Sequence, residues 1–192
     1  MKKQATYLLF LFLLFSGAAL AGRKVEDYSK TINLFRENET VAPYFKSAYG
    51  YAVFPTVAKG GLGIGASHGK GQVYRGGKVT GFTSLTSVSI GFQAGGQAFS
   101  QIIFFKDKSA YENFTSGNFE FDANASAVAI TASAQASGST AGSTASAGAG
   151  GTAGTQANAD YRKGMLVFTI AKGGLMYEVS IGGQKFSYKP AG

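Results

Sequence analysis

The stretch from Gly50 to Tyr74 reads GYAVFPTVAKGGLGIGASHGKGQVY, and it decides the fold. Its start, Tyr51 to Phe54, is an apolar run typical of a β-strand. The tract that follows has glycine at positions 60, 61, 63, 65, 69 and 71, together with Lys59 and Lys70 and no acidic residue. Alternate residues of a strand share one face, so glycines two apart predict a face that another backbone or a ligand can approach closely.

The chain on either side of this stretch is mostly β in pattern. Phe82 to Gln93 alternates, with Val88, Ile90 and Phe92 on one face. Ala98 to Phe105 is almost continuously apolar and predicts a strand that is buried on both faces. Two more strands are predicted at Met165 to Ile170 and Leu175 to Ile181. The pairs Gly76-Gly77 and Gly182-Gly183 are typical of two-residue hairpin turns.

Three short helices complete the predicted fold. Arg23 to Arg36 carries one narrow apolar stripe at helical spacing, made of Val25, Tyr28, Ile32 and Phe35. Its polar positions mix acids and bases, which favours docking on the core over lying on a membrane. A second helix is expected from Pro43 to about Gly50, and a third from an Asp107 cap through Phe114, closed by Gly117. The sequence therefore predicts an α+β fold: a curved, mostly antiparallel sheet or partial barrel, with short N-terminal helices and one short internal helix.

One region is compositionally unusual. From Ala123 to Ala136 alanine recurs at nearly every second position, which suits a strand facing a very close layer. Ser137 to Asn158 contains mainly Gly, Ser, Ala and Thr, without charge or large apolar side chains. Such a segment buries too little apolar surface to offset its ordering entropy, so 137–158 is predicted to be a flexible loop. The alternative interpretation is a lid that contacts a membrane or a partner.

The first residues have the form of a secretory signal peptide. Met1-Lys2-Lys3 is basic, Tyr7 to Phe15 is apolar, and Ala19-Leu20-Ala21 is a small-residue cleavage site. We expect residues 1–21 to be removed and residues 22–192 to form a single domain in the periplasm or envelope. The chain has no cysteine, so neither a lipoprotein anchor nor a disulfide framework is expected.

Charge points toward anionic partners, and residue content argues against catalysis. The chain carries a formal charge of +8, of which Lys2 and Lys3 contribute two. A basic exported protein suits anionic surfaces, although the same charge also serves solubility alone. With one histidine, His68, and no cysteine, neither a multi-histidine metal site nor a Cys/His site is available. His68 is interpreted as an exposed loop or strand residue rather than a general base. The glycine tract matches neither the Walker nor the dinucleotide motif, so nucleotide binding by these motifs is not expected. No pair of acids has a catalytic partner, so no enzyme activity, cofactor or metal is expected. Most Tyr and Phe residues lie at core positions and the chain carries an export signal, so nucleic-acid binding is not expected either.

The glycine-rich stretch, the later VSIGFQAGGQAFSQIIFF and the closing KGMLVFTIAKGGLMYEVSIGGQKFSYKP together resemble the SYLF domain family. The resemblance covers about Arg23 to Pro190. It departs from the family in lacking tryptophan and in having the long insert at 137–158. The resemblance implies lipid binding without catalytic residues. Actin binding, which is described for fungal members, is not expected in an exported bacterial-type protein.

Two functional hypotheses follow. The first is an exported peripheral protein that recognises anionic phospholipid headgroups through a basic, glycine-rich surface. The residues expected to form that surface are Lys59, Lys70, Arg75, Lys78, Gly61, Gly63 and Gly65. Against it stands the alternative that the glycines serve sheet curvature and the bases are simply solvated. The second hypothesis is an envelope structural or protein-interaction module that uses its edge strands and low-complexity loop.

The signal-peptide interpretation predicts where the chain is cut. Intact-mass measurement of protein recovered from the envelope should give a chain that begins at Gly22. An uncleaved chain recovered from the cytoplasm would contradict the prediction.

Overall fold

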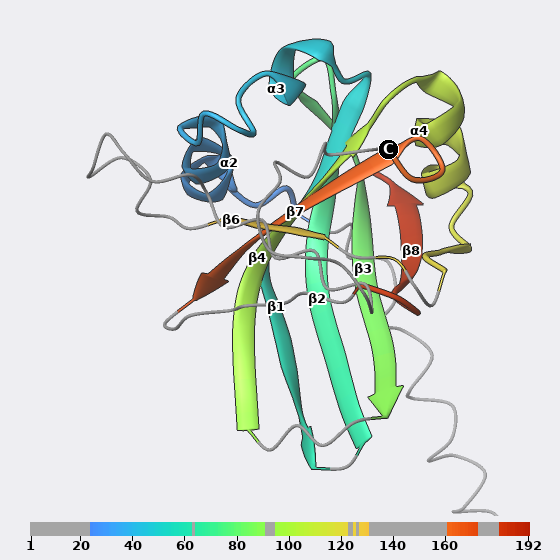
Figure 1. Cartoon of the computed structure of the whole chain (residues 1–192). Helices are drawn as coiled ribbons and strands as arrows, with labels where there is room; N and C mark the ends of the chain where they lie inside the picture. Colours follow the sequence, from blue (N-terminus) through green and yellow to red (C-terminus); the bar gives the residue numbers. More distant parts are fainter. Residues whose placement is uncertain are drawn as a thin grey trace, which may run out of the picture.

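The computed structural model describes residues 24–62, 64–90, 95–122, 125, 127–130, 161–172 and 181–192 (Figure 1). Four predicted features lie wholly or almost wholly outside these residues: the signal peptide at 1–21, Gly63, the loop at 137–158 and the strand at 175–181. Among the described residues, no helix combines the length and the hydropathy needed to cross a membrane.

Within the described residues, eight strands form one sheet in the order β5-β8-β3-β2-β1-β4-β7-β6. The strands are β1 (Gly50–Leu62), β2 (Ile64–Arg75), β3 (Lys78–Ile90), β4 (Gly95–Phe105), β5 (Phe119–Glu120), β6 (Val128–Ile130), β7 (Met165–Lys172) and β8 (Lys185–Pro190). All neighbours are antiparallel except β6 and β7. Since β4 lies beside β1, the four long strands have Greek-key order. The sheet curls into a half-barrel, which confirms the predicted α+β fold (Figure 1).

The three helices of the described part of the chain are short and pack at one end of this sheet (Figure 1). They are α2 (Ser29–Arg36), α3 (Tyr44–Ser47) and α4 (Lys108–Thr115). Helices α2 and α3 pack on one face through a cluster that includes Phe35 and Phe104, and we call this the α2 face. Helix α4 packs on the other face through a cluster that includes Phe114 and Phe54, and we call this the α4 face. Both faces of the sheet are therefore buried at the helical end.

The first helix begins six residues later than the sequence predicted. Residues 24–28 form no helix, because polar groups of this segment hydrogen-bond to other parts of the chain. The amide of Gln72, on β2, donates to the backbone carbonyl of Glu26 at 2.9 Å, and the Asp27 carboxylate accepts the Ser29 N–H at 2.9 Å. Hydrogen bonds from the Ser29 side chain, and then from its backbone N–H, lower the pKa of Asp27, and they lead the chain into α2 at Ser29. The predicted docking on the core is confirmed for Ile32 and Phe35, both buried, whereas Val25 is exposed.

The second helix is shorter than predicted, since α3 ends at Ser47 and Gly50 already begins β1. Three other local signals are confirmed closely. The Asp107 carboxylate accepts the Ala110 N–H at 2.9 Å and caps α4, and Gly117 follows this helix with a φ of 90°. Gly76 and Gly77 join β2 to β3 with φ values of 57° and 77°, the left-handed pair that a tight hairpin needs. Strand β4 is buried continuously from Phe99 to Phe105.

A bulge at Pro55 changes which residues of β1 share a face. Pro55 has no N–H to donate, and the register against β2 and β4 shifts by one residue between Val53 and Val57. Phe54 and Val57 therefore both lie in the core of the α4 face. The Ser100 hydroxyl donates to the Pro55 carbonyl at 2.8 Å and closes the irregular site.

Beyond the bulge, the four long strands extend past all three helices (Figure 1). On the α2 face of this projecting half, the side chains of Thr56, Ala58, His68 and Lys70 are exposed. The sheet there relies on backbone pairing and small residues rather than on an aromatic core. Among the described residues, no helix covers the α2 face of this projecting half.

Close packing predicts that alanine will be tolerated at one glycine of the long strands and will destabilise the fold at another. A Cβ at Gly71 would lie 2.6 Å from the Val53 carbonyl oxygen and 2.7 Å from the Phe54 ring, whereas the nearest atom to a Cβ at Gly96 is 4.0 Å away. Gly71→Ala should therefore lower the free energy of unfolding by about 1–3 kcal/mol, and Gly96→Ala should leave it nearly unchanged. Urea unfolding of both variants checks this, and equal stabilities would contradict it.

Candidate functional site

The two lysines of the glycine-rich stretch lie on opposite faces of the sheet. Lys70 pairs with Thr56 and is exposed on the α2 face. Lys59 pairs with Ser67 and Gln97 on the α4 face, where it is half-buried. The Pro55 bulge causes this separation, because an uninterrupted ladder would place Lys59 on the same face as Lys70.

The other predicted bases lie at the far end of the same strands. Arg75 ends β2 and Lys78 begins β3, on either side of the Gly76-Gly77 turn and at the helical end of the sheet. Lys70 is five residues from Arg75 along β2, about 16 Å in an extended strand. The structure therefore does not bring the four predicted bases together into one surface.

The glycines of the tract divide into two groups by position, of which the first contains the predicted site residues. Gly61 and Gly65 pair with each other near the free end of the β1–β2 hairpin, and Gly63 lies outside the described residues. Gly69 and Gly71 are buried, and their missing side chains make room for Val57 and Phe54. Close approach does occur at these two glycines, but the approaching groups are core side chains.

A row of residues crosses six strands on the open part of the α2 face. Reading from β7 to β8, the paired positions are Lys172, Ala98, Ala58, His68, Thr86 and Lys185. The Lys172 ammonium donates to the Thr56 hydroxyl at 2.6 Å, and Thr56 is the cross-strand partner of Lys70. We call Lys70, Lys172 and Lys185 the lysine band. Sequence reasoning missed Lys172 and Lys185, because only the pairing of distant strands places them beside Lys70.

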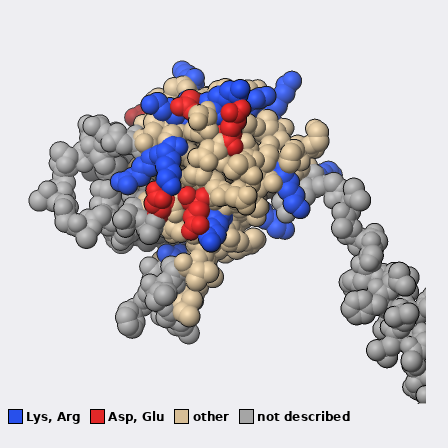
Figure 2. Space-filling view, turned by 90° about the vertical axis from the view of Figure 1, so that its right-hand side faces the viewer, with Lys and Arg blue, Asp and Glu red and all other residues tan. Residues whose placement is uncertain are grey.

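No carboxylate neutralises Lys70 or Lys172 among the described residues. The described ion pairs are Lys108–Glu112, Lys163–Asp122 and Lys185–Glu120, at 3.4, 2.8 and 3.5 Å. The sequence has no acidic residue between Glu39 and Asp107, a span that contains all four long strands. In Figure 2 the acids lie among bases on the upper body, and none is seen on the narrow lower end. The band therefore joins two unpaired ammonium groups to the neighbouring hydroxyls of Thr56 and Thr86, an arrangement suited to phosphate oxygens.

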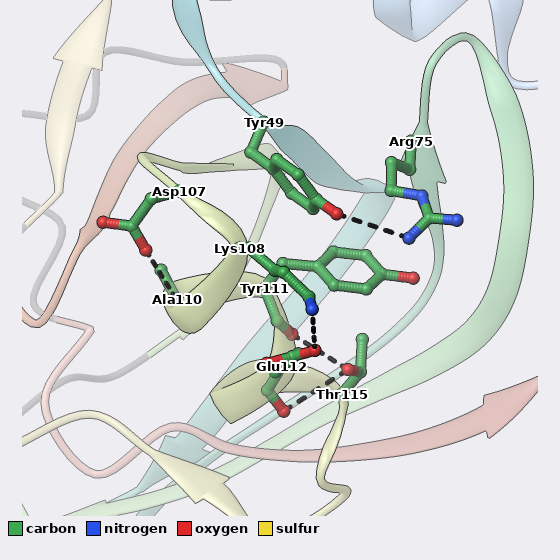
Figure 3. A network of polar contacts seen from close by, with 8 residues as sticks. All are labelled: Tyr49, Arg75, Asp107, Lys108, Ala110, Tyr111, Glu112 and Thr115. Carbon is green, nitrogen blue, oxygen red and sulfur yellow. Dashed lines mark hydrogen bonds and ion pairs between the residues drawn. The ribbon is translucent and has the colours of Figure 1, made fainter.

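Arg75, by contrast, has a structural environment (Figure 3). Its guanidinium carbon lies 6.0 Å from the centre of the Tyr49 ring and 5.7 Å from that of Tyr111, and the group donates to the Tyr49 hydroxyl at 3.4 Å. Tyr111 comes from α4 and Tyr49 from the residue just before β1. Arg75 thus ties the end of the sheet to helix α4.

Tyrosine hydroxyls complete this junction. Tyr111 donates to the Thr80 hydroxyl at 3.0 Å, and Tyr188 donates to the Thr80 carbonyl at 2.9 Å. Burial raises the pKa of Tyr188, and the adjacent Tyr111 raises it further, while Arg75 acts in the opposite direction. The Tyr188 phenol therefore remains a protonated donor at neutral pH, and the two tyrosines hold the junction together.

A pocket beside β5 and the end of α4 is lined by two acids that are already paired. Glu120 and Asp122 both face it, beside Asn113 and Asn118. Lys185 and Lys163 neutralise the two carboxylates. Within the described parts of the chain, no group of three or more His, Asp or Glu side chains is placed to hold a metal ion. His68 is exposed on β2, as the simpler of its two interpretations predicted.

Comparison with known proteins agrees with the family resemblance. The model of the Ysc84 family, described as "Las17-binding protein actin regulator", matches residues 86–190, just over half of the chain. A curated relative, "Beta cell expansion factor A" from Aeromonas veronii, is 27% identical over 157 residues, which are 81% of this chain. The aligned region is 51% of that relative, so the chain matches about half of the relative's length.

The aromatic clamp predicts that Arg75 serves stability rather than binding. Arg75→Gln removes one hydrogen bond and two cation–π contacts, and it should lower the free energy of unfolding by about 1 kcal/mol. Binding to anionic vesicles should not change. Lys78→Gln is the matched control and should alter neither property. If Arg75→Gln kept its native stability but bound anionic vesicles more weakly, Arg75 would belong to the binding surface and this prediction would be wrong.

Proposed function

The chain belongs to the Ysc84, or SYLF, family of lipid-binding domains, and from this premise we propose that it is an exported peripheral protein that binds anionic phospholipid headgroups through the lysine band. The pairing of Lys70 and Lys172 around Thr56, without a carboxylate among the described residues, is the observation that carries the proposal. Two ammonium groups held on one face repel each other, and a phosphate between them relieves that repulsion.

The surroundings of the band support a membrane surface over a small soluble anion. The band lies on an exposed sheet face, and no pocket among those described includes it. A site on an open sheet face gives a small anion few contacts, whereas a bilayer presents many phosphates at once. Each lysine near an anionic membrane contributes about 1 kcal/mol, so a few residues acting together suffice for reversible attachment.

The sequence also favours a membrane partner outside the cytoplasm. The signal-peptide features of residues 1–21 support export to the periplasm or envelope. Actin is named in the description of the family model, but an exported protein of bacterial type would not meet it. We therefore propose a phospholipid surface as the partner, with neither actin nor nucleic acid as a ligand.

Neutralising the two unpaired lysines should weaken membrane binding. Lys70→Gln with Lys172→Gln should reduce the affinity for vesicles of phosphatidylglycerol and phosphatidylcholine at least tenfold, since about 2 kcal/mol is lost. Lys78→Gln with Lys108→Gln removes the same charge from the helical end and should retain binding. Co-sedimentation at low and high salt measures both variants, and the wild type should lose affinity as salt rises.

Three results would refute this assignment. The first is equal loss of binding in the two double variants, which would show that only net charge matters. The second is wild-type binding to neutral vesicles as strong as to anionic ones. The third is displacement of the protein from vesicles by millimolar inorganic phosphate, which would indicate a site for a free anion. Melting temperatures of both double variants would show that the fold is intact.

A further inference from the structure

Two large apolar side chains are exposed together at the free end of the sheet. Ile64 on β2 is 66% exposed, and Val88 on β3 is 72% exposed. Ile64 pairs with Ile90 and Val88 pairs with Ala66, so the two residues are diagonal neighbours on the α2 face. Exposed isoleucine and valine have no favourable contact with water, and their adjacency gives the end of the sheet an apolar surface.

The next row beyond the lysine band on the same face carries no charge. It consists of Gly96, Gly60, Ala66 and Val88, all exposed, and Ile64 lies in the row after it. The face thus changes from cationic to uncharged and partly apolar as the strands run toward their free end. A polar protein partner would not require that order, whereas a bilayer has the same order of layers.

Strand geometry allows the lysines to contact phosphates while Ile64 and Val88 reach the hydrocarbon. Val88 is two residues beyond Thr86, which lies in the row of the lysine band, and Ile64 is four residues beyond His68 in the same row. At about 3.3 Å per residue, the two side chains lie about 7 and 13 Å past the band. The headgroup layer of one leaflet is about 5–8 Å thick. With the lysines at the phosphates, a tilted sheet therefore brings both side chains to the edge of the hydrocarbon.

From this geometry we propose that the free end of the β1–β2–β3 sheet inserts into the membrane interface, with Ile64 and Val88 beneath the phosphates that the lysine band binds. This inference rests on the proposed function and adds to it a depth and an orientation. The helical end, where most of the described acids lie, faces away from the membrane (Figures 1 and 2).

A second copy of the chain is a less suitable occupant of this surface. A stable protein interface buries about 1,200–2,000 Å² in total, far more than one isoleucine, one valine and a few small residues can supply. Two copies would also bring their unpaired lysines together. A bilayer demands no shape complementarity and provides anionic groups for those lysines.

The chain has no tryptophan, so a single introduced tryptophan reports on one position only. Ile64→Trp and Val88→Trp are the test variants, and Asn113→Trp, exposed on α4, is the control. On anionic phosphatidylglycerol vesicles the two test variants should shift their emission to the blue. Lipids brominated near the top of the acyl chain should quench them, and the control should do neither. A separate double variant, Ile64→Ser with Val88→Ser, should bind at least tenfold more weakly while keeping its salt dependence.

The outcomes separate this inference from the proposed function. If the wild type does not bind anionic vesicles, both are wrong. If it binds while tryptophan at 64 and 88 keeps a water-exposed spectrum without quenching, the insertion is wrong and headgroup binding stands. A blue shift that grows with protein concentration in the absence of lipid would instead show that a second copy covers the tip. The Trp variants add apolar surface at exposed positions, which could affect folding. Their melting temperatures should equal that of the wild type, which will show that they fold.

Discussion

The missing N–H of Pro55 is the constraint on which the faces of this sheet depend. Without a donor at that point, β1 gains one unpaired residue, and every position beyond it changes sides. Phe54 and Val57 then pack into the same core, and Lys59 goes with them to the α4 face. Lys70, on the neighbouring strand, stays on the α2 face. One backbone group thus decides which lysines share a surface.

The molecule separates stability from recognition along the length of its strands. At the helical end both faces are buried by aromatic side chains. The ring centroids of Phe104 and Phe45 are 5.0 Å apart on one face, and those of Phe105 and Phe114 are 5.0 Å apart on the other. At the other end the strands are held by backbone pairing, with glycines where side chains cross from the next strand. Since few large side chains fix the free end, its exposed face can vary in chemistry at little cost to the core.

The sequence predicted those features that depend on neighbouring residues. The Gly76-Gly77 turn, the Asp107 cap and the buried strand from Phe99 to Phe105 all have local causes, and all were confirmed. The binding surface was beyond such reasoning, because Lys172 reaches Lys70 only through the pairing of β7, β4, β1 and β2. The start of α2 was also missed, since a side chain 46 residues away in sequence, Gln72, holds the preceding segment.

The distribution of acids gives the proposed orientation an electrostatic cause. All described acids lie on or beside the helices and β5, and none lies on the four long strands. At the helical end these acids are mixed with bases such as Arg36, Lys46 and Lys108, whereas Glu120 is the single described acid that pairs with a base of the lysine band. An anionic surface therefore attracts the free end over roughly a Debye length, about 8–10 Å, with little opposition from acids. The lysine band is attracted to the anionic surface before any contact forms, because Lys70 and Lys172 are exposed and have no carboxylate partner among the described residues. Apolar contact acts only at touching distance, so Ile64 and Val88 enter after charge has already oriented the sheet. The charges would then set the rate of association with the membrane, and the burial of Ile64 and Val88 would set the rate of dissociation.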